Sequence, residues 1–462
     1  MKAKNVVIIN THDTGTFLSP YGYNVPSDNL LDFCEDALLF RNAFCASPTC
    51  SPSRASMLTG SYPHTNGMLT LSHRGTSIVD MDRHLCRYLR NHGFHTALCG
   101  IQHEHKFWRP YELGMEASRE IGYQDNITSS LEGVTDDTKL LEWDYRNAQN
   151  VADYIQKYDK EEPFFISYGM QATHRIYPEL TEEDQIDVDH IKVPDNVADN
   201  PENRYDTACL HKSIKSFDKC FQTVRDAMIE SGHYDDTMLI YVTDHGLANP
   251  FSKCNLYDDG IKTSLIMHVP GYEESYGKAY EGLVSQIDIY PTICEWLGLK
   301  IPEWVQGTSF LSAFDNQQEE INQEVYAEVN LHASYEPQRC IRTKRYKYIC
   351  YYDPTWDKVN LANIDDSVPK SFLLAHGLRE HRKEKEQLYD LYYDPHERNN
   401  LVHDSRYNKV LEDMRKKLSD WRKKTKDHII DFSEYQGIMK VNKKESEHAS
   451  SKDMNDYESL IK

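Results

Sequence analysis

Short apolar runs that end in polar or glycine residues recur along the first 271 residues of this 462-residue chain. They lie at 5–10, 95–100, 163–169, 237–246 and 264–271. Their length and their β-branched and aromatic content are typical of buried strands. The intervening segments 138–158 and 211–232 carry apolar residues near a 3.6-residue period, as amphipathic helices do. Strands that alternate with helices predict an α/β fold, with a mostly parallel sheet covered on both faces.

The pattern changes at about residue 312, where the polar stretch 312–324 predicts a linker. Beyond it, residues 338–353 and 386–401 alternate apolar and polar positions, as antiparallel strands with one solvated face do. A basic amphipathic helix is predicted at 410–429, and the charged residues after it should be loosely held. We therefore divide the chain into a large α/β domain (1–325), a small antiparallel domain with a helix (326–430) and a charged tail (431–462).

The composition narrows the choice of partner. A formal net charge of -21 would repel a nucleic acid or an anionic membrane at long range, so neither is expected as a partner. The longest apolar runs fall short of the roughly 20 residues that a membrane helix needs. The start, MKAKNVVIIN, lacks the pattern of an export signal, and the 11 cysteines have irregular spacing. These features predict reduced thiols and a cytoplasmic protein.

The most specific local signal is Cys50-Ser51-Pro52-Ser53-Arg54-Ala55-Ser56-Met57-Leu58-Thr59-Gly60. Pro52 is expected to set a turn, and the run from Ala55 to Gly60 to begin a helix. This arrangement would direct backbone N–H groups and Arg54 toward an anion. The alternative interpretation is a buried, inert cysteine at the start of a helix.

Polar pairs follow two of the predicted strands. His12 and Asp13 come after the run 5–10, and Asp244 and His245 come after the run of 237–243. Because the carboxyl ends of parallel strands meet at one edge of a sheet, these side chains could hold a divalent cation beside a nucleophile. One such pair alone would more often cap a helix or make a turn. Two pairs together with the cysteine motif favour a metal site.

The run from Cys50 resembles the C-x-P-S-R-x-x-x-L-T-G signature of type I sulfatases. The resemblance implies that Cys50 is oxidised to formylglycine by a formylglycine-generating or radical maturase. The hydrated aldehyde offers one hydroxyl to attack sulfur and a second whose deprotonation expels sulfate. The fold implied is the alkaline phosphatase-like sandwich, a large mostly parallel sheet flanked by helices with a small C-terminal antiparallel sheet and helix.

The same resemblance assigns roles to further side chains. His103 matches a family histidine next to the nucleophile, but Ile101 stands where the family has a sulfate-binding lysine. His174 matches the histidine that protonates the leaving group, a role that suits its near-neutral ordinary pKa. Lys253 and Arg54 match the residues that hold the sulfate, and His64 matches a histidine near the site that contacts substrate.

The metal pairs depart from the family pattern, which is commonly Asp-Asp at the first position and Asp-Asn at the second. Here they are His12-Asp13 and Asp244-His245. Calcium prefers oxygen ligands, whereas imidazole suits manganese or zinc, so the ion could be any of the three. An Asp-His second pair is also similar to the phosphonate monoester hydrolases of the same superfamily.

The resemblance spans nearly the whole chain and is closest to the N-sulfoglucosamine sulfohydrolases (heparan N-sulfatases), as in LFRNAFCASPTCSPSRASMLTG, HTNGM and LYDLYYDPHERNNL. It implies metal-assisted hydrolysis of a sulfate ester or sulfamate on a small anionic substrate, such as a sulfated amino sugar. Two alternatives remain open. One is a phosphonate monoester or phosphodiester hydrolase, and the other is a non-catalytic protein that binds sulfated glycans, for which Ile101 is the argument.

Overall fold

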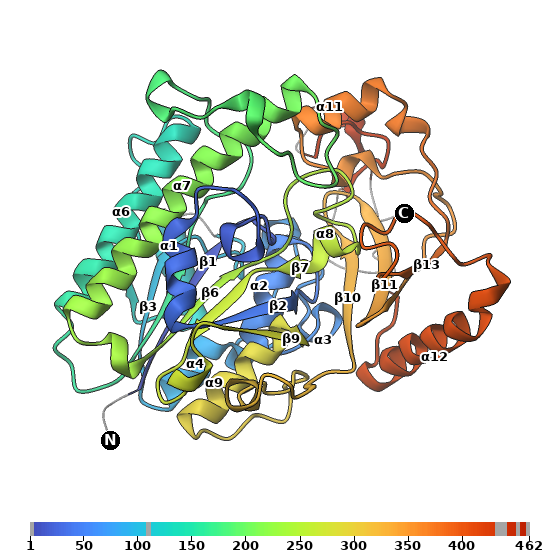
Figure 1. Ribbon diagram of the computed structural model, residues 1–462. Helices are drawn as coiled ribbons and strands as arrows, with labels where there is room; N and C mark the ends of the chain where they lie inside the picture. The colour runs from blue at the N-terminus through green and yellow to red at the C-terminus, as the bar shows by residue number, and fades with distance from the viewer. Residues whose placement is uncertain (1–3, 108–111, 430–440, 450–452, 459–462) are drawn as a thin grey trace.

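The computed structural model describes residues 4–107, 112–429, 441–449 and 453–458. Its largest element is a nine-stranded sheet in the order β4-β3-β5-β1-β6-β8-β2-β7, with β9 paired to β2 (Figure 1). The strands are β1 (Asn5–Thr11), β2 (Leu38–Phe44), β3 (His95–Gly100), β4 (Asp125–Asn126), β5 (Phe164–Gly169), β6 (Thr237–Thr243), β7 (Lys262–Thr263), β8 (Leu265–His268) and β9 (Lys278–Ser285). The predicted large, mostly parallel sheet is therefore confirmed.

The centre of this sheet is parallel because β1, β3, β4, β5 and β6 all run the same way. The run 264–271 contains a strand, as predicted, and β8 is an exception within the mostly parallel sheet because it pairs antiparallel with β6. The connection from β6 carries the site loop and the four-residue helix α8 (Asp258–Ile261) instead of a long crossover helix. A parallel return normally requires such a crossover.

Helices cover both faces of the large sheet, as predicted (Figure 1). One face packs against α1 (Asp28–Phe33), α6 (Asp137–Gln156) and α7 (Pro201–Glu230), and the other against α2 (Cys50–Thr59), α4 (Leu85–Asn91) and α9 (Ile289–Leu297). Alternate residues of β1 supply the two cores, Val7 and Ile9 to the first, Val6 and Ile8 to the second. Burial on both faces explains why the strand sequence is continuously apolar.

The smaller helices lie between these elements: α3 (Pro63–Asn66), α5 (Glu112–Ile121), α10 (Ser312–Asp315) and α11 (Val368–Ala375). The segment expected to be a linker thus begins with the short helix α10. The predicted helix 211–232 forms, but it starts ten residues earlier, at Pro201, where the Asn200 side chain caps the backbone N–H of Asn203.

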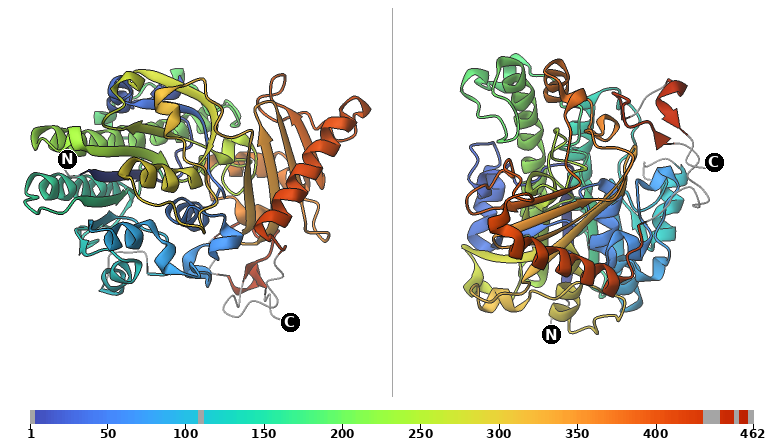
Figure 2. Two further views of the ribbon diagram at one scale, coloured as in Figure 1. Left: turned by 90° about the horizontal axis from the view of Figure 1, so that it is seen from below. Right: turned by 90° about the vertical axis from the view of Figure 1, so that its right-hand side faces the viewer.

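A second, four-stranded antiparallel sheet follows, with strands β10 (Glu324–Leu331), β11 (Tyr335–Thr343), β12 (Tyr346–Tyr351) and β13 (Glu386–Asp390). One face packs on the large domain, where Val325 and Val329 contact the core around Phe44. The other face is covered by α12 (Asn408–Thr425), through residues that include Leu418 and Trp421 (Figure 2). The prediction that one face of this sheet is solvated is therefore wrong, because α12 buries that face.

The end of the chain is also more ordered than expected over the part that is described. Strands β14 (Val441–Asn442) and β15 (Tyr457–Glu458) form an antiparallel pair. Val441 is fully buried, and the Asn442 N–H donates to the Ala333 carbonyl at 2.9 Å. These contacts contradict a loose tail for residues 441–449, while the prediction for 430–440, 450–452 and 459–462 lies outside the described residues.

The carboxyl ends of β3 and β5 approach so closely that only glycine fits. A Cβ on Gly100 would lie 2.0 Å from the Gly169 carbonyl oxygen, and one on Gly169 would lie 2.0 Å from the Ile101 carbonyl oxygen. Gly100 also has a φ of +77°, a conformation that L side chains rarely adopt. This close contact fixes where the loops after β3 and β5 leave the edge of the sheet.

We expect Gly100→Ala to lower the free energy of unfolding by at least about 2 kcal/mol, because the backbone oxygen cannot move aside without breaking the β3–β5 pairing. Thermal unfolding of the purified protein measures this effect. Gly93→Ala is the matched control, since Gly93 also has a positive φ (+88°) but nothing within 4 Å of its Cβ position. It should cost only about 1 kcal/mol, and equal losses in both variants would contradict the close-approach argument.

Candidate active site and metal centre

Four parallel strands end at the same level of the sheet and position the predicted residues. In the registers, Thr11 of β1 lies opposite Thr243 of β6, while Gly169 of β5 lies opposite both Asn10 and Gly100. The loops that follow therefore leave from one edge. They carry His12, Asp13, His103, His174, Asp244 and His245.

The two predicted metal-binding pairs converge. The Asp13 N–H donates to Asp244 Oδ1 at 2.9 Å, and Asp13 adopts a left-handed conformation with a φ of +53°. His12 Nδ1 lies 2.7 Å from Asp13 Oδ1 and 3.3 Å from Asp244 Oδ2, and His245 Nε2 lies 3.2 Å from Asp13 Oδ1. Together with Cys50 Sγ, one potential ligand atom from each of these residues lies within 4.8 Å of all the others.

This donor set fits a divalent cation. All four side chains are at most 1% exposed, so the carboxylates have little water to solvate them. Burial lowers the pKa of His12 to about 4, which leaves a neutral imidazole able to bind a metal. Burial would raise the pKa of Asp13, but Lys253, His245 and His12 hold it well below its ordinary value. Two imidazoles with two carboxylates suit manganese or zinc better than calcium.

Cys50 is the first residue of α2, so the helix begins at the cysteine and not within the run from Ala55 to Gly60. The extended backbone of Thr49 precedes it, and Pro52 is tolerated in the first turn because its missing N–H would have no helical partner there. Cys50 is 2% exposed, with Sγ 3.4 Å from His245 Nε2. Burial raises the pKa of its thiol well above the ordinary value.

Two cationic side chains flank the cysteine and the metal cluster. Arg54 donates from Nε to Asp244 Oδ2 at 3.2 Å and from Nη1 to the Ile101 carbonyl at 3.4 Å, while its buried Nη2 has no partner in the described chain. Lys253 Nζ lies 2.8 Å from both Asp13 and Asp365. These groups supply donors where an anion next to Cys50 would sit.

The cluster opens onto a cavity of about 600 Å³. Its walls include His12, Cys50, His73, Arg74, Ile101, His103, Trp143, His174, Arg175, Lys253, His332 and Asp365. The ring centroids of His103 and His174 lie 5.0 and 4.7 Å from that of His12. Burial lowers the pKa of His103 well below its ordinary value, so this ring is neutral. Ile101 lines the wall with an apolar side chain where the family pattern has a lysine.

Five predicted site residues do not line this cavity: Asp13, Asp244 and His245 belong to the cluster behind it, Arg54 contacts Asp244, and His64 does neither. Its Nδ1 pairs with Glu328 of β10, and its ring stacks on Tyr62 and lies edge-on to Trp421 of α12. Arg339 completes the group through Glu328 and Asp427. The expectation that His64 contacts substrate is therefore not supported, because the side chain is engaged in an ion-pair network between the large domain and the small sheet.

Sequence reasoning missed several residues of the cavity wall. Asp365 and His332 come from loops of the C-terminal part and belong to no motif. Arg74 stands in SHRGT, which gives no sign of a site. Trp143 lies on a predicted amphipathic helix, where an aromatic residue would be assigned to the core.

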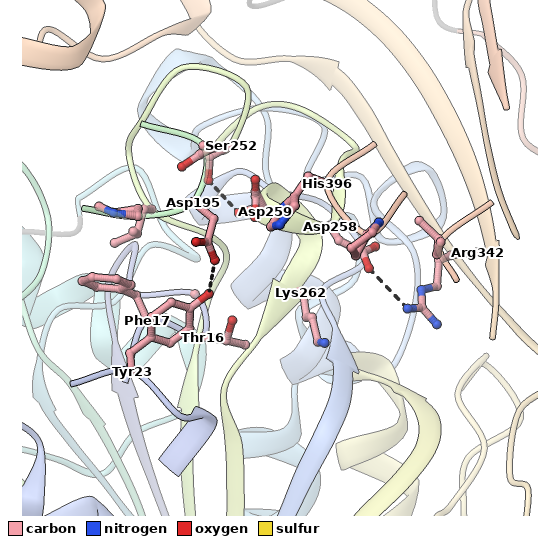
Figure 3. A pocket seen from close by; sticks show the side chains of 16 residues that line it. Thr16, Phe17, Tyr23, Asp195, Ser252, Asp258, Asp259, Lys262, Arg342 and His396 are labelled. Carbon is pink, nitrogen blue, oxygen red and sulfur yellow. Dashed lines mark hydrogen bonds and ion pairs between the residues drawn. The ribbon is translucent and has the colours of Figure 1, made fainter. Parts of the chain in front are cut away.

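A second cavity, of about 240 Å³, touches the metal-binding loops at Gly15 and Leu247 but contains none of the predicted residues (Figure 3). Its polar lining combines three aspartates with Lys262, Arg342 and His396, and Asp258 is paired with Arg342. It lacks a nucleophile beside a metal cluster, so the chemistry belongs to the larger cavity. In the described part of the chain no helix is both long and apolar enough to cross a membrane.

Comparisons with known proteins find sulfatases and a related hydrolase. The chain is 26% identical over 482 residues to the human N-sulphoglucosamine sulphohydrolase, covering 92% of this chain and 91% of that protein. It is 27% identical over 394 residues to an ulvan-active sulfatase from Formosa agariphila, covering 84% and 73%. A solved structure, the phosphonate monoester hydrolase of Agrobacterium radiobacter, superposes with a TM-score of 0.69 at 17% identity over 91% of this chain and 96% of that one.

Two family profiles match the chain directly. The profile described as N-sulphoglucosamine sulphohydrolase, C-terminal, matches residues 244–372. The sulfatase profile matches residues 4–299, which carry Cys50 and both pairs predicted to bind a metal. The chain belongs to the sulfatase family and is an enzyme with the alkaline phosphatase-like α/β fold.

Proposed function

We propose that the protein hydrolyses the sulfamate of an N-sulfated glucosamine or a closely related sugar sulfate, with formylglycine derived from Cys50 and one divalent cation. The observation that carries this proposal is the convergence of Cys50 Sγ with the side chains of His12, Asp13, Asp244 and His245 within 4.8 Å. A reaction between a nucleophile and a metal-bound oxyanion requires groups this close.

The divalent cation and the aldehyde at position 50 would each supply one part of the chemistry. A bound divalent cation would neutralise charge on the sulfuryl oxygens, and an aldehyde at position 50 would provide the diol whose hydroxyl attacks sulfur. His12, Asp13, Asp244 and His245 are the residues that would hold the ion.

The chain's own side chains would do the rest. Arg54 Nη2 and Lys253 Nζ would bind the sulfuryl oxygens, since both are buried cationic donors beside Cys50. His174, whose ring contacts that of His12 in the cavity wall, would protonate the departing nitrogen or oxygen of the substrate. His103, a neutral ring, would accept a proton from the diol. Fixed donors of this kind in a dry site commonly make the largest catalytic contribution.

The choice of a sulfamate rests on the relatives. The human relative is named an N-sulphoglucosamine sulphohydrolase, and the matching C-terminal profile carries the same name. A phosphonate monoester hydrolase is the second candidate, because the Asp244-His245 pair suits it and a structure of that activity shares the fold.

The test is a comparison of three substrates at equal concentration: N-sulfoglucosamine, an aryl sulfate and an aryl phosphonate monoester. We expect kcat/KM to be highest for N-sulfoglucosamine, provided that mass spectrometry of the peptide containing Cys50 shows an aldehyde in place of the thiol. Fastest turnover of the phosphonate would favour the second candidate. No turnover of any substrate by protein carrying the aldehyde and a metal would refute both.

A further inference from the structure

Arg74 lies in the wall of the same cavity as Cys50. The loop that carries it is fixed to the start of α2, because the Ser72 N–H donates to the Ser51 hydroxyl at 3.0 Å. The Ser72 hydroxyl in turn donates to the His105 carbonyl at 3.0 Å. Arg74 therefore lies on a loop that hydrogen bonds hold beside the helix carrying Cys50. No step of the proposed reaction uses Arg74.

Among the described residues, the guanidinium of Arg74 has weak, neutral partners. Its Nη1 lies 3.4 Å from the Ala333 carbonyl and 3.4 Å from Asn442 Oδ1, and its Nη2 lies 3.2 Å from the Ala449 carbonyl. Its Nε is buried and has no hydrogen-bond partner in the described residues. No ion pair links Arg74 to a carboxylate of the described chain. Burial lowers the pKa of this guanidinium, which is the direction expected for a cation without a counter-ion.

The other cations that line the cavity differ in this respect. Arg175 makes two bonds with Asp206, at 2.7 and 2.8 Å, and Lys253 is held between Asp13 and Asp365. Their charges are compensated by the protein. Among the described residues no carboxylate compensates the charge of Arg74, and a desolvated cation costs free energy unless something supplies the anion.

A second unsatisfied donor or acceptor lies close to Arg74. His332 lines the cavity, is 4% exposed, and has a buried Nδ1 without a hydrogen-bond partner among the described residues. It precedes Ala333, whose carbonyl accepts from Arg74 Nη1. Two residues of the wall, from different parts of the chain, therefore each have a buried nitrogen without a hydrogen-bond partner among the described residues.

We infer that Arg74 and His332 form a second anion subsite, which binds a further sulfate or carboxylate on the sugar whose sulfamate faces Cys50. The inference rests on the proposed function and narrows the substrate class to sugars with at least two anionic groups. A chain of net charge -21 cannot attract such a polyanion at long range, so it needs a local unpaired cation to select one. A cavity of about 600 Å³ has room for a sugar with both groups.

The test compares N-sulfoglucosamine with two doubly anionic relatives, glucosamine 2-N,6-O-disulfate and N-sulfoglucosamine linked to a uronic acid. We expect the wild-type enzyme to prefer one of the two, which identifies the second group as sulfate or carboxylate. In Arg74→Gln that preference over N-sulfoglucosamine should fall by about 10-fold to 100-fold, because a charge-assisted hydrogen bond is lost. Arg74→Lys should retain part of it, and Arg83→Gln, which removes a surface arginine, should retain all of it.

Calorimetric binding to protein with Cys50→Ala separates the two hypotheses, because it needs no turnover. If Arg74→Gln, added to Cys50→Ala, selectively weakens the binding of the doubly anionic ligands, the subsite is supported even if no substrate is hydrolysed. If the wild-type enzyme hydrolyses the sulfamate but Arg74→Gln changes all three substrates equally, or none, the subsite is refuted while the proposed function survives.

Discussion

Cys50→Ala should abolish hydrolysis, with kcat/KM falling by at least about 10⁴-fold, as expected for the loss of a nucleophile. Alanine lacks the thiol of Cys50, without which the Cβ at the start of α2 cannot be oxidised to the aldehyde. The side chain is buried and small, so the fold should persist at a cost of about 1 kcal/mol. Steady-state kinetics on N-sulfoglucosamine, with thermal unfolding of the same sample, measures both effects.

Cys294→Ala is the matched control for this prediction. Cys294 is fully buried in α9 and contributes to a core cluster away from the cavity wall. Its replacement should reduce stability by a similar amount and leave kcat/KM within about twofold. Full activity of Cys50→Ala, or an equal loss in both variants, would show that the cysteine is not the source of the nucleophile.

Asp13→Asn should reduce the metal content of the purified protein and lower kcat/KM by at least about 100-fold. Asp13 contributes to the cluster through Oδ1, and a neutral amide is a weaker ligand with no charge to offer the ion. Elemental analysis of protein loaded with manganese, zinc or calcium measures the loss and identifies the preferred ion. The imidazoles of His12 and His245 predict manganese or zinc.

Asp365→Asn provides the control, because Asp13 and Asp365 each lie 2.8 Å from Lys253 but only Asp13 belongs to the metal cluster. Both variants deprive the buried ammonium of one carboxylate. If the loss of activity comes from the metal, Asp365→Asn should retain its ion. Equal loss of metal in both variants would instead assign the effect to the Lys253 ion pair.

Most of the site could be predicted because its residues follow recognisable strands or stand in a motif. The apolar runs at β1 and β6 predicted where His12 and Asp244 leave the sheet, and parallel pairing brings such loops together. Cys50 and Arg54 were found from the motif alone. The structure gives the position of each residue relative to its neighbours, and the chemical role of each residue is part of the proposed function.

The parts that could not be predicted depend on tertiary contacts. The direction of β8 is set by the path of a loop, and a strand of the same composition can run either way. Arg74 contacts Ala333, the neighbour of His332, only after the small sheet docks on the large domain, so neither Arg74 nor His332 carries a local signal. The role of His64 was predicted from a neighbourhood that resembles the family, and nothing in that neighbourhood shows that Glu328 and Trp421 contact its side chain.

Binding of an ion at the proposed metal site would also couple ion supply to the stability of the folded enzyme. Asp13 and Asp244 are 231 positions apart yet joined by a 2.9 Å hydrogen bond, so the ligand set exists only after the sheet has formed. An ion that binds the folded chain alone would add about 1.4 kcal/mol to its stability for each tenfold rise in free concentration above the dissociation constant. Scarcity of that ion would therefore lower the number of folded enzyme molecules as well as the rate of hydrolysis by each of them.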